Sequence, residues 1–267
     1  MQSHFLQRED ILKTTITLFL LLIVSTAFAD LKYYSPDLTA KLSSHSLKDD
    51  ALKSALFTLI SAKQVTLGYN GARVIMFGQL YLKSDSQGYY IQDVYCQKRF
   101  GSSAGVGPGA IPKADKINCE HTWPQSKFTS AFDNETQKSD LHHLYPSDSK
   151  ANSIRGNIDF TDVSHDNGAL ASDECSASKF GSSVMKNNDG FEAPLTHKGN
   201  VARSIFYFSV RYKMVIPKNE EEVLRRWNDL DPVDQEEMNR NNAIEKVQGN
   251  RNPFIDFPGL ANDISKF

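Results

Sequence analysis

The sequence has few cysteines, no excess of one charge and, beyond its first 29 residues, no long hydrophobic run. Lysine and arginine number 30 against 32 aspartate and glutamate, a net charge of −2, so affinity for a polyanion must come from a local basic surface. Hydrophobic residues make up 40% and charged residues 23%, which excludes wholesale disorder and allows a substantial core. No internal repeat or linker divides residues 30–267, so we expect one domain there.

The strongly apolar segment lies near the N-terminus. Residues 14–29 read TTITLFLLLIVSTAFA, follow Lys13 and end in Ala-Phe-Ala, a small-x-small pattern typical of signal-peptidase sites. The run is shorter than the ~20 residues that span a bilayer, so we interpret residues 1–29 as a signal peptide and not as an anchor. This predicts export to the periplasm or the medium, with no membrane attachment of the mature chain.

Three cysteines follow this segment: Cys96, Cys119 and Cys175. In an oxidising compartment two of them can pair and one is left over, and the sequence leaves all three pairings open. There is no CxxC motif, and in a strand the side chain of Cys119 would point away from that of Glu120. The spacing therefore argues against a zinc site.

Periodicity and turn residues predict a mixed α+β fold. Apolar residues recur at helical spacing in three regions, and Pro232 divides the third of them into two helices. A β-prone aromatic cluster indicates a strand, whereas short apolar pieces between Asn, Asp, Ser and Gly indicate strands and loops. The expected elements are helices over residues 47–67, 199–213 and 219–247, a strand over 88–95, a loop over 101–113, and strands and loops over 117–160.

Two neighbouring segments concentrate reactive residue types. Residues 119–124 read CEHTWP, and residues 140–146 read DLHHLYP and run on to Asn152, Arg155 and Asn157. Three of the 7 histidines fall in these segments, which makes them the candidate site.

The residue types suit hydrolysis of a phosphodiester. That reaction needs a base for water, a cation facing the phosphate and a group that shields the leaving oxygen. Histidine, with a pKa near ~6.5, can be the base at neutral pH. A hard cation such as Mg²⁺ prefers oxygen ligands and keeps several waters, so one carboxylate and one amide suffice. Glu120, His121 and Asn152 are the corresponding candidates.

The whole pattern resembles the bacterial endonuclease I group of periplasmic and secreted nucleases, built on the ββα-metal or His-Me finger motif. The resemblance spans nearly all of the mature chain, and although each short match could arise by chance, the ordered set is specific. Beyond the two segments, it includes Lys198-Gly199-Asn200-Val201-Ala202-Arg203, Trp227, Asp231-Pro232, Glu237, Arg240-Asn241 and Gln248-Gly249-Asn250-Arg251-Asn252-Pro253-Phe254.

The resemblance implies a mechanism as well as a fold: a single α+β domain with a ββα-metal core and surrounding helices. His121 would end a strand of a β-hairpin and act as general base, oriented by a backbone carbonyl. Glu120 and Asn152, the latter on the following helix, would bind Mg²⁺ or another divalent cation such as Mn²⁺ or Ca²⁺. The expected product ends are 5′-phosphates, and the expected substrate is DNA, with RNA as a second candidate, contacted without sequence specificity by a monomer.

Two departures leave the phosphate contact open. Some relatives carry an acidic residue where Lys138 stands and an arginine in the loop between the two segments, which holds none here. Arg155 is therefore our candidate for this catalytic contact, with Lys127 or a residue from another element as alternatives.

The remaining polar residues have less specific expectations. His142 and His143 are expected to have structural roles more often than to bind metal, and Asn157 is a candidate for site support. Arg203 could bind phosphate or brace the site. Two other functions stay open: an exported nucleic-acid-binding protein with little or no turnover, and a metal-dependent hydrolase of another periplasmic polymer such as the cell wall.

Overall fold

The computed structural model describes residues 33–170, 175–184 and 188–267. The chain divides into two compact units, Met1–Tyr34 and Ser35–Phe267, and the helices and strands described belong to the second. The predicted signal peptide lies outside the described residues. Within the described ranges, no helix is long and apolar enough to cross a membrane.

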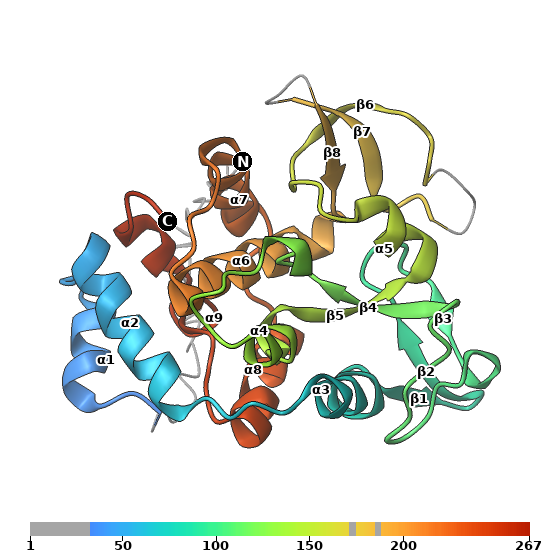
Figure 1. Ribbon diagram of the computed structural model, residues 1–267, viewed down its shortest axis with the longest axis horizontal. Coiled ribbons are helices and arrows are strands. Elements are labelled where there is room, and N and C mark those ends of the chain that lie inside the picture. Colours follow the sequence, from blue (N-terminus) through green and yellow to red (C-terminus); the bar gives the residue numbers. More distant parts are fainter. Residues whose placement is uncertain (1–32, 171–174, 185–187) are drawn as a thin grey trace, which may run out of the picture. The chain divides into compact units, whose positions relative to one another are not determined.

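Helices and short strands alternate along this unit, which confirms the α+β fold class (Figure 1). The α-helices described are α1 (Pro36–Ser43), α2 (Asp49–Lys63), α3 (Tyr69–Ile75), α4 (Asn134–Lys138), α5 (Ser149–Arg155), α6 (Lys198–Tyr212), α7 (Lys218–Leu230), α8 (Gln235–Gln248) and α9 (Pro253–Asp256). The strands described are β1 (Lys83–Asp85), β2 (Gly88–Gln92), β3 (Arg99–Phe100), β4 (Ile117–His121), β5 (Leu144–Asp148), β6 (Val163–Asp166), β7 (Lys179–Ser183) and β8 (Asp189–Glu192).

The described strands form three small antiparallel sheets, ordered β1-β2-β3, β4-β5 and β6-β7-β8. The hairpin β4–β5 matters most for function. Helix α5 packs against both of its strands, and α6 packs against the 3₁₀ turn Leu141–His143 that leads into β5 (Figure 1). Because helices cover the hairpin, β5 is buried along its whole length, including the polar Ser147 and Asp148 at its end.

The predicted helices are confirmed with shifted ends. Helix α2 falls within residues 47–67, α6 matches 199–213, and α7 and α8 divide 219–247 on either side of Pro232. Proline lacks the N–H that a continuous helix needs, and Asp234 then caps α8 by accepting the N–H of Glu237 at 2.7 Å.

The predicted strand over 88–95 is too long, because β2 ends at Gln92. The carboxylate of Asp93 accepts the backbone N–H groups of Tyr95, Cys96 and Lys98 at 2.7–3.0 Å. These bonds fold the backbone into a tight loop and take the donors that a strand would use. The segment over 117–160 is mostly strands and loops, as expected, and also holds the short helices α4 and α5.

The cysteine pairing, which the sequence leaves open, is Cys96 with Cys175. This disulfide ties the loop after β2 to the segment before β7. Cys119 is free and buried in β4, and burial raises the pKa of its thiol to about 12. A thiol with so high a pKa is a poor nucleophile at neutral pH, so Cys119 is a packing residue.

The hydrophobic core lies directly beneath the hairpin. Met76, Ile117, Leu144, Tyr145 and Ile244 are among its buried members, so residues from the α3 region, both hairpin strands and α8 meet there. Burying large side chains of this kind contributes roughly 1.5–3 kcal/mol each, and this anchors the hairpin as a rigid support for the residues at its end.

Candidate active site

The hairpin and the helix that follows it place the predicted residues near one another. Glu120 and His121 end β4, opposite Tyr145 and Leu144 of β5. Helix α5 starts at the next residue after β5, and the carboxylate of Asp148 caps it by accepting two backbone N–H groups at 2.9 and 3.0 Å. This direct strand-to-helix connection fixes the direction of α5, which carries Asn152 and Arg155.

Glu120 is a buried carboxylate with charged and neutral partners. Its side chain is 1% exposed, and its Oε1 accepts the hydroxyl of Tyr95 at 2.9 Å and forms an ion pair with Nη1 of Arg155 at 2.8 Å. Burial raises the pKa of Glu120, and Arg155 and Tyr95 oppose that rise because they stabilise the charged form. Arg155 is therefore the counter-charge of Glu120 in the fold.

The guanidinium of Arg155 also holds the backbone at the end of β4. It donates to the carbonyls of His121 and Thr122, the former at 2.9 Å, and lies 4.4 Å from the ring centre of Phe160. Its side chain is 1% exposed. The structure thus places Arg155 inside the protein, where Nη1 and Nη2 already have protein acceptors and the buried Nε has no partner among the described residues.

Asn152 stands one helical turn before Arg155. Its Nδ2 donates to the carbonyl of Cys119 at 3.2 Å, which leaves the amide oxygen as the atom that could bind a cation. In the described part of the chain, no three His, Cys, Asp or Glu side chains gather to form a metal site. A carboxylate and an amide oxygen on adjoining elements, completed by water, nevertheless fit a hard divalent cation.

His121 has the geometry of a general base. Its Nε2 lies 3.2 Å from the carbonyl oxygen of Lys138, and because a carbonyl only accepts, Nε2 carries the proton and Nδ1 keeps its lone pair. The exposed amide of Gln125 donates to Nδ1 at 3.3 Å. Burial, followed by the neighbouring His143, holds the pKa of His121 well below its usual range, so the imidazole is neutral at pH 7.

His142 and His143 face inward and brace the turn before β5. Their Nε2 atoms lie 3.1 Å from the carbonyl of Asn250 and 2.8 Å from that of Gln137, respectively. Both side chains are fully buried, and burial lowers each pKa to about 4. Both are thus neutral at pH 7 and packed within the protein.

Sequence reasoning missed the role of Asp140, which opens the DLHHLYP segment. Its buried carboxylate accepts the hydroxyls of Tyr207 and Tyr212 at 2.9 Å each and the amides of Gln64 and Gln248 at 3.0 and 2.8 Å. A buried charge with so many donors fixes the segment to α6 and α8. The sequence signal for this role is that Asp140 directly precedes a segment rich in residues expected in the core, which indicates a buried carboxylate.

The other candidates are bound to partners of their own. Arg203 of α6 is 1% exposed, and both arms of its fork bind Glu237 of α8 at 2.8 and 2.6 Å. Lys127 pairs with Asp159 at 2.7 Å. Asn157 is exposed and donates to the hydroxyl of Ser126 at 3.4 Å. Arg203 would have to leave Glu237, and Lys127 would have to leave Asp159, before either could bind a phosphate.

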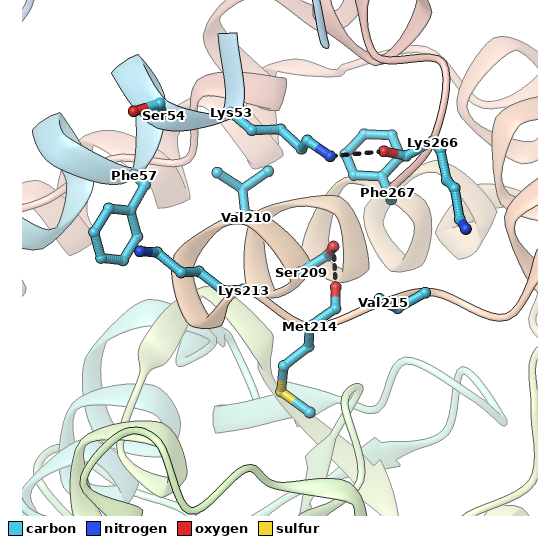
Figure 2. Close-up of a pocket in the computed structure, with 10 residues that line it drawn as sticks. All are labelled: Lys53, Ser54, Phe57, Ser209, Val210, Lys213, Met214, Val215, Lys266 and Phe267. Carbon is cyan, nitrogen blue, oxygen red and sulfur yellow. Dashed lines mark hydrogen bonds between the residues drawn. The ribbon is translucent and has the colours of Figure 1, made fainter. Parts of the chain in front are cut away.

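A cavity of about 350 Å³ lies elsewhere, between α2, the end of α6 and the C-terminal residues. Its walls combine aromatic and aliphatic side chains with three lysines, and Figure 2 shows Lys213 directed at the ring of Phe57. None of the candidate catalytic residues lines it. The cavity is therefore not the site of the chemistry described above.

Comparison with known proteins places this chain in the class of the nucleases. The family model described as Endonuclease I matches residues 48–259, a range that includes β4, β5 and α5. The chain belongs to the endonuclease I family.

Named relatives act, by their names, on both kinds of nucleic acid. The chain is 31% identical over 272 residues to an extracellular ribonuclease of Bacillus amyloliquefaciens, covering 90% of this chain and 81% of the relative. It is 36% identical over 168 residues to an extracellular ribonuclease of Bacillus subtilis (strain 168), covering 55% of this chain and 53%, about half, of that relative. It is 26% identical over 174 residues to an extracellular deoxyribonuclease of Aeromonas hydrophila, covering 58% and 71%.

Proposed function

We propose that this protein is an exported, metal-dependent endonuclease that hydrolyses phosphodiester bonds in DNA and RNA without sequence specificity and leaves 5′-phosphate ends. The observation that carries the proposal is the neutral His121 at the end of the hairpin, with Nε2 bound to a carbonyl and Nδ1 available as a base. The extracellular and periplasmic relatives support export.

Each residue has a distinct role in this proposal. Nδ1 of His121 takes a proton from the attacking water once the amide of Gln125 has moved aside. Glu120 and Asn152 would hold the cation, which when bound would supply the positive charge that stabilises the phosphate and its leaving oxygen. Arg155 is a positioning residue, because it acts through the carboxylate of Glu120 and the backbone of His121.

The proposed chemistry does not distinguish DNA from RNA. Water is the nucleophile, so the 2′-hydroxyl of RNA takes no part in the cleavage, and the backbone phosphates are common to both polymers. This is consistent with a family whose named members include ribonucleases and deoxyribonucleases. The sequence favours DNA, and the ribonucleases among these relatives support RNA as a second substrate to test.

The test uses the mature chain on supercoiled plasmid and on a labelled RNA. We expect cutting of both with Mg²⁺, none with EDTA, and products that accept a kinase label only after phosphatase treatment. His121→Ala should lose at least about a hundredfold in rate, the lower range for a lost general base, while retaining nucleic-acid binding. His165→Ala is the matched control, because His165 is exposed on β6.

The outcomes separate the candidate functions. Undiminished cutting by His121→Ala, or cutting in EDTA, would refute the mechanism. A parent protein that retards DNA and RNA in gels but never cuts either would be the nucleic-acid-binding protein without turnover. Cleavage of cell-wall polymer in place of both nucleic acids would identify the other hydrolase.

A further inference from the structure

The site as described holds no free cation for the substrate phosphate. Arg155 is inside the protein with Glu120, and Lys127 is paired with Asp159. Phosphodiester cleavage nevertheless places a negatively charged phosphate beside His121, and nucleases bind the backbone mainly through lysine and arginine. Residues outside the two sequence segments must therefore be considered.

Two such cations lie over the ring of Tyr69, which in turn packs against His121. The ring of Tyr69 is 5.5 Å from that of His121 between centroids. Cζ of Arg73 lies 4.7 Å and Nζ of Lys138 lies 4.4 Å from the centre of the same tyrosine ring. We call Tyr69, Arg73 and Lys138 the Tyr69 cluster; its members come from the start and end of α3 and the end of α4.

Among the described residues, neither cation of the Tyr69 cluster forms an ion pair with a carboxylate. Arg73 donates from Nη2 to the amide oxygen of Asn70 at 3.1 Å, and its buried Nε has no hydrogen-bond partner in the described chain. The nearby acid, Glu135, accepts the backbone N–H of Tyr69. Two positive charges therefore share one ring without a carboxylate between them, and because they repel each other an anion bound there would be stabilised.

The surrounding structure holds the cluster in a fixed position relative to the base. Glu135 and Thr136 of α4 bind the backbone of Tyr69 and the hydroxyl of Thr66, the latter at 2.7 Å, and so join α3 to α4. The backbone carbonyl of Lys138 is the group that orients His121. Lys138 thus touches the base through its backbone and presents its ammonium group beside it.

We infer that the Tyr69 cluster binds the backbone phosphate of the strand being cut, with Arg73 and Lys138 as the phosphate-binding residues and Tyr69 as their support. This inference rests on the proposed nuclease function. It accounts for both departures from the relatives, because Lys138 is itself one of them and Arg73 supplies the guanidinium that the loop between the two segments lacks. The guanidinium offers a fork of donors, and the buried Nε is one that phosphate could engage.

The first experiment measures binding without cleavage. The parent and the variants all carry His121→Ala and are kept in EDTA, and the affinity for a fluorescent single-stranded oligonucleotide is measured against salt concentration. Each phosphate contact contributes about 0.7 to the slope of log affinity against log salt for a single strand. Arg73→Ala and Lys138→Ala should each lower the slope by about 0.7, and the double variant by about 1.4.

The protein provides a matched control for each cation. Arg99 lies 3.7 Å from the ring centre of Tyr90 but is paired with Asp85, and Lys213 lies 4.1 Å from that of Phe57 in the cavity of Figure 2. Arg99→Ala and Lys213→Ala remove the same chemical groups from an aromatic ring elsewhere. Both should leave the salt slope unchanged.

The second experiment measures cleavage in the background with an intact His121. Arg73→Ala should lower kcat/KM by about tenfold to a hundredfold, the value of a charged hydrogen bond. Arg73→Lys should restore the salt slope but only part of kcat/KM, because an ammonium keeps the charge and loses the fork. Lys138→Ala keeps its carbonyl, so the pH profile set by His121 should not move.

The phosphate-binding role and the nuclease function can fail separately. An unchanged salt slope in the Arg73 and Lys138 variants, or an equal drop in the controls, overturns the phosphate-binding role. If the parent does not cut but the cluster variants lose slope, the nuclease function fails while the binding site stands. Circular dichroism and thermal melting of every variant exclude unfolding as the cause.

Discussion

Replacing Arg155 by methionine tests whether the buried pair with Glu120 holds the candidate site together. Methionine fills much of the same space beside Phe160 but removes every donor. Glu120 would keep the hydroxyl of Tyr95 and lose its counter-charge, and the carbonyls of His121 and Thr122 would lose their partner. Breaking one side of a buried ion pair costs about 3–5 kcal/mol, and we expect a loss of that size in the free energy of unfolding at pH 7.

The loss should depend on pH in a defined direction. Without Arg155, the pKa of Glu120 rises further above its value in the unfolded chain. A carboxyl with a raised pKa in the folded state destabilises the fold only when ionised, so its cost is absent below the unfolded pKa of about 4.3 and grows as pH rises through that value. The difference between parent and variant should therefore shrink from pH 7 towards pH 4.

Urea unfolding at pH 4 and pH 7 measures both effects. Arg226→Met is the control, since Arg226 pairs with Asp162 at the surface and should contribute less than about 1 kcal/mol. Adding Glu120→Gln to Arg155→Met removes the unpaired charge and should recover much of the stability without restoring cleavage. A loss below about 1 kcal/mol at pH 7, or the same loss at both pH values, would contradict this account of the pair.

Two other expectations concern stability. Burial raises the pKa of Glu220 from 4.5 to about 7, so the free energy of unfolding falls as pH rises across that interval. Glu220→Gln removes the charge but keeps an acceptor for the N–H of Phe160. In urea titrations this variant should be more stable than the parent by about 3 kcal/mol at pH 8 and equal to it at pH 4. The disulfide closes a loop of 79 residues, so Cys96→Ala with Cys175→Ala should lower the free energy of unfolding by about 4 kcal/mol. Reduction of the parent by dithiothreitol should lower it by the same amount, and no change on reduction would contradict this expectation.

Local patterns were the predictable part of the fold. The apolar periodicity of α2 and α6 and the break at Pro232 are properties of neighbouring residues, and the structure keeps them. The strand β2 was predicted too long because aromatic residues continue after Gln92, whereas the chain turns where the carboxylate of Asp93 gathers three backbone donors. A pattern of side-chain types does not reveal that competition for backbone hydrogen bonds.

Long-range partners were not predictable. The sequence left three cysteine pairings open, and only the fold brings Cys96 to Cys175, which are 79 positions apart. It also left two roles for Arg203, and the fold places that side chain against Glu237 of another helix. In both cases the deciding contact joins segments that are far apart along the chain.

The sequence by itself determined which chemistry is available. Glu120, His121 and Asn152 lie on a hairpin and the helix directly after it, so their relation follows from local structure. Tertiary packing decided which cations have carboxylate partners. It turns Arg155 inward to neutralise Glu120, and it brings Arg73 and Lys138 onto Tyr69, next to His121, where we propose that they bind phosphate. The reason is physical: whether an arginine or lysine is free depends on which carboxylate the fold sets against it, and that partner can come from anywhere in the chain.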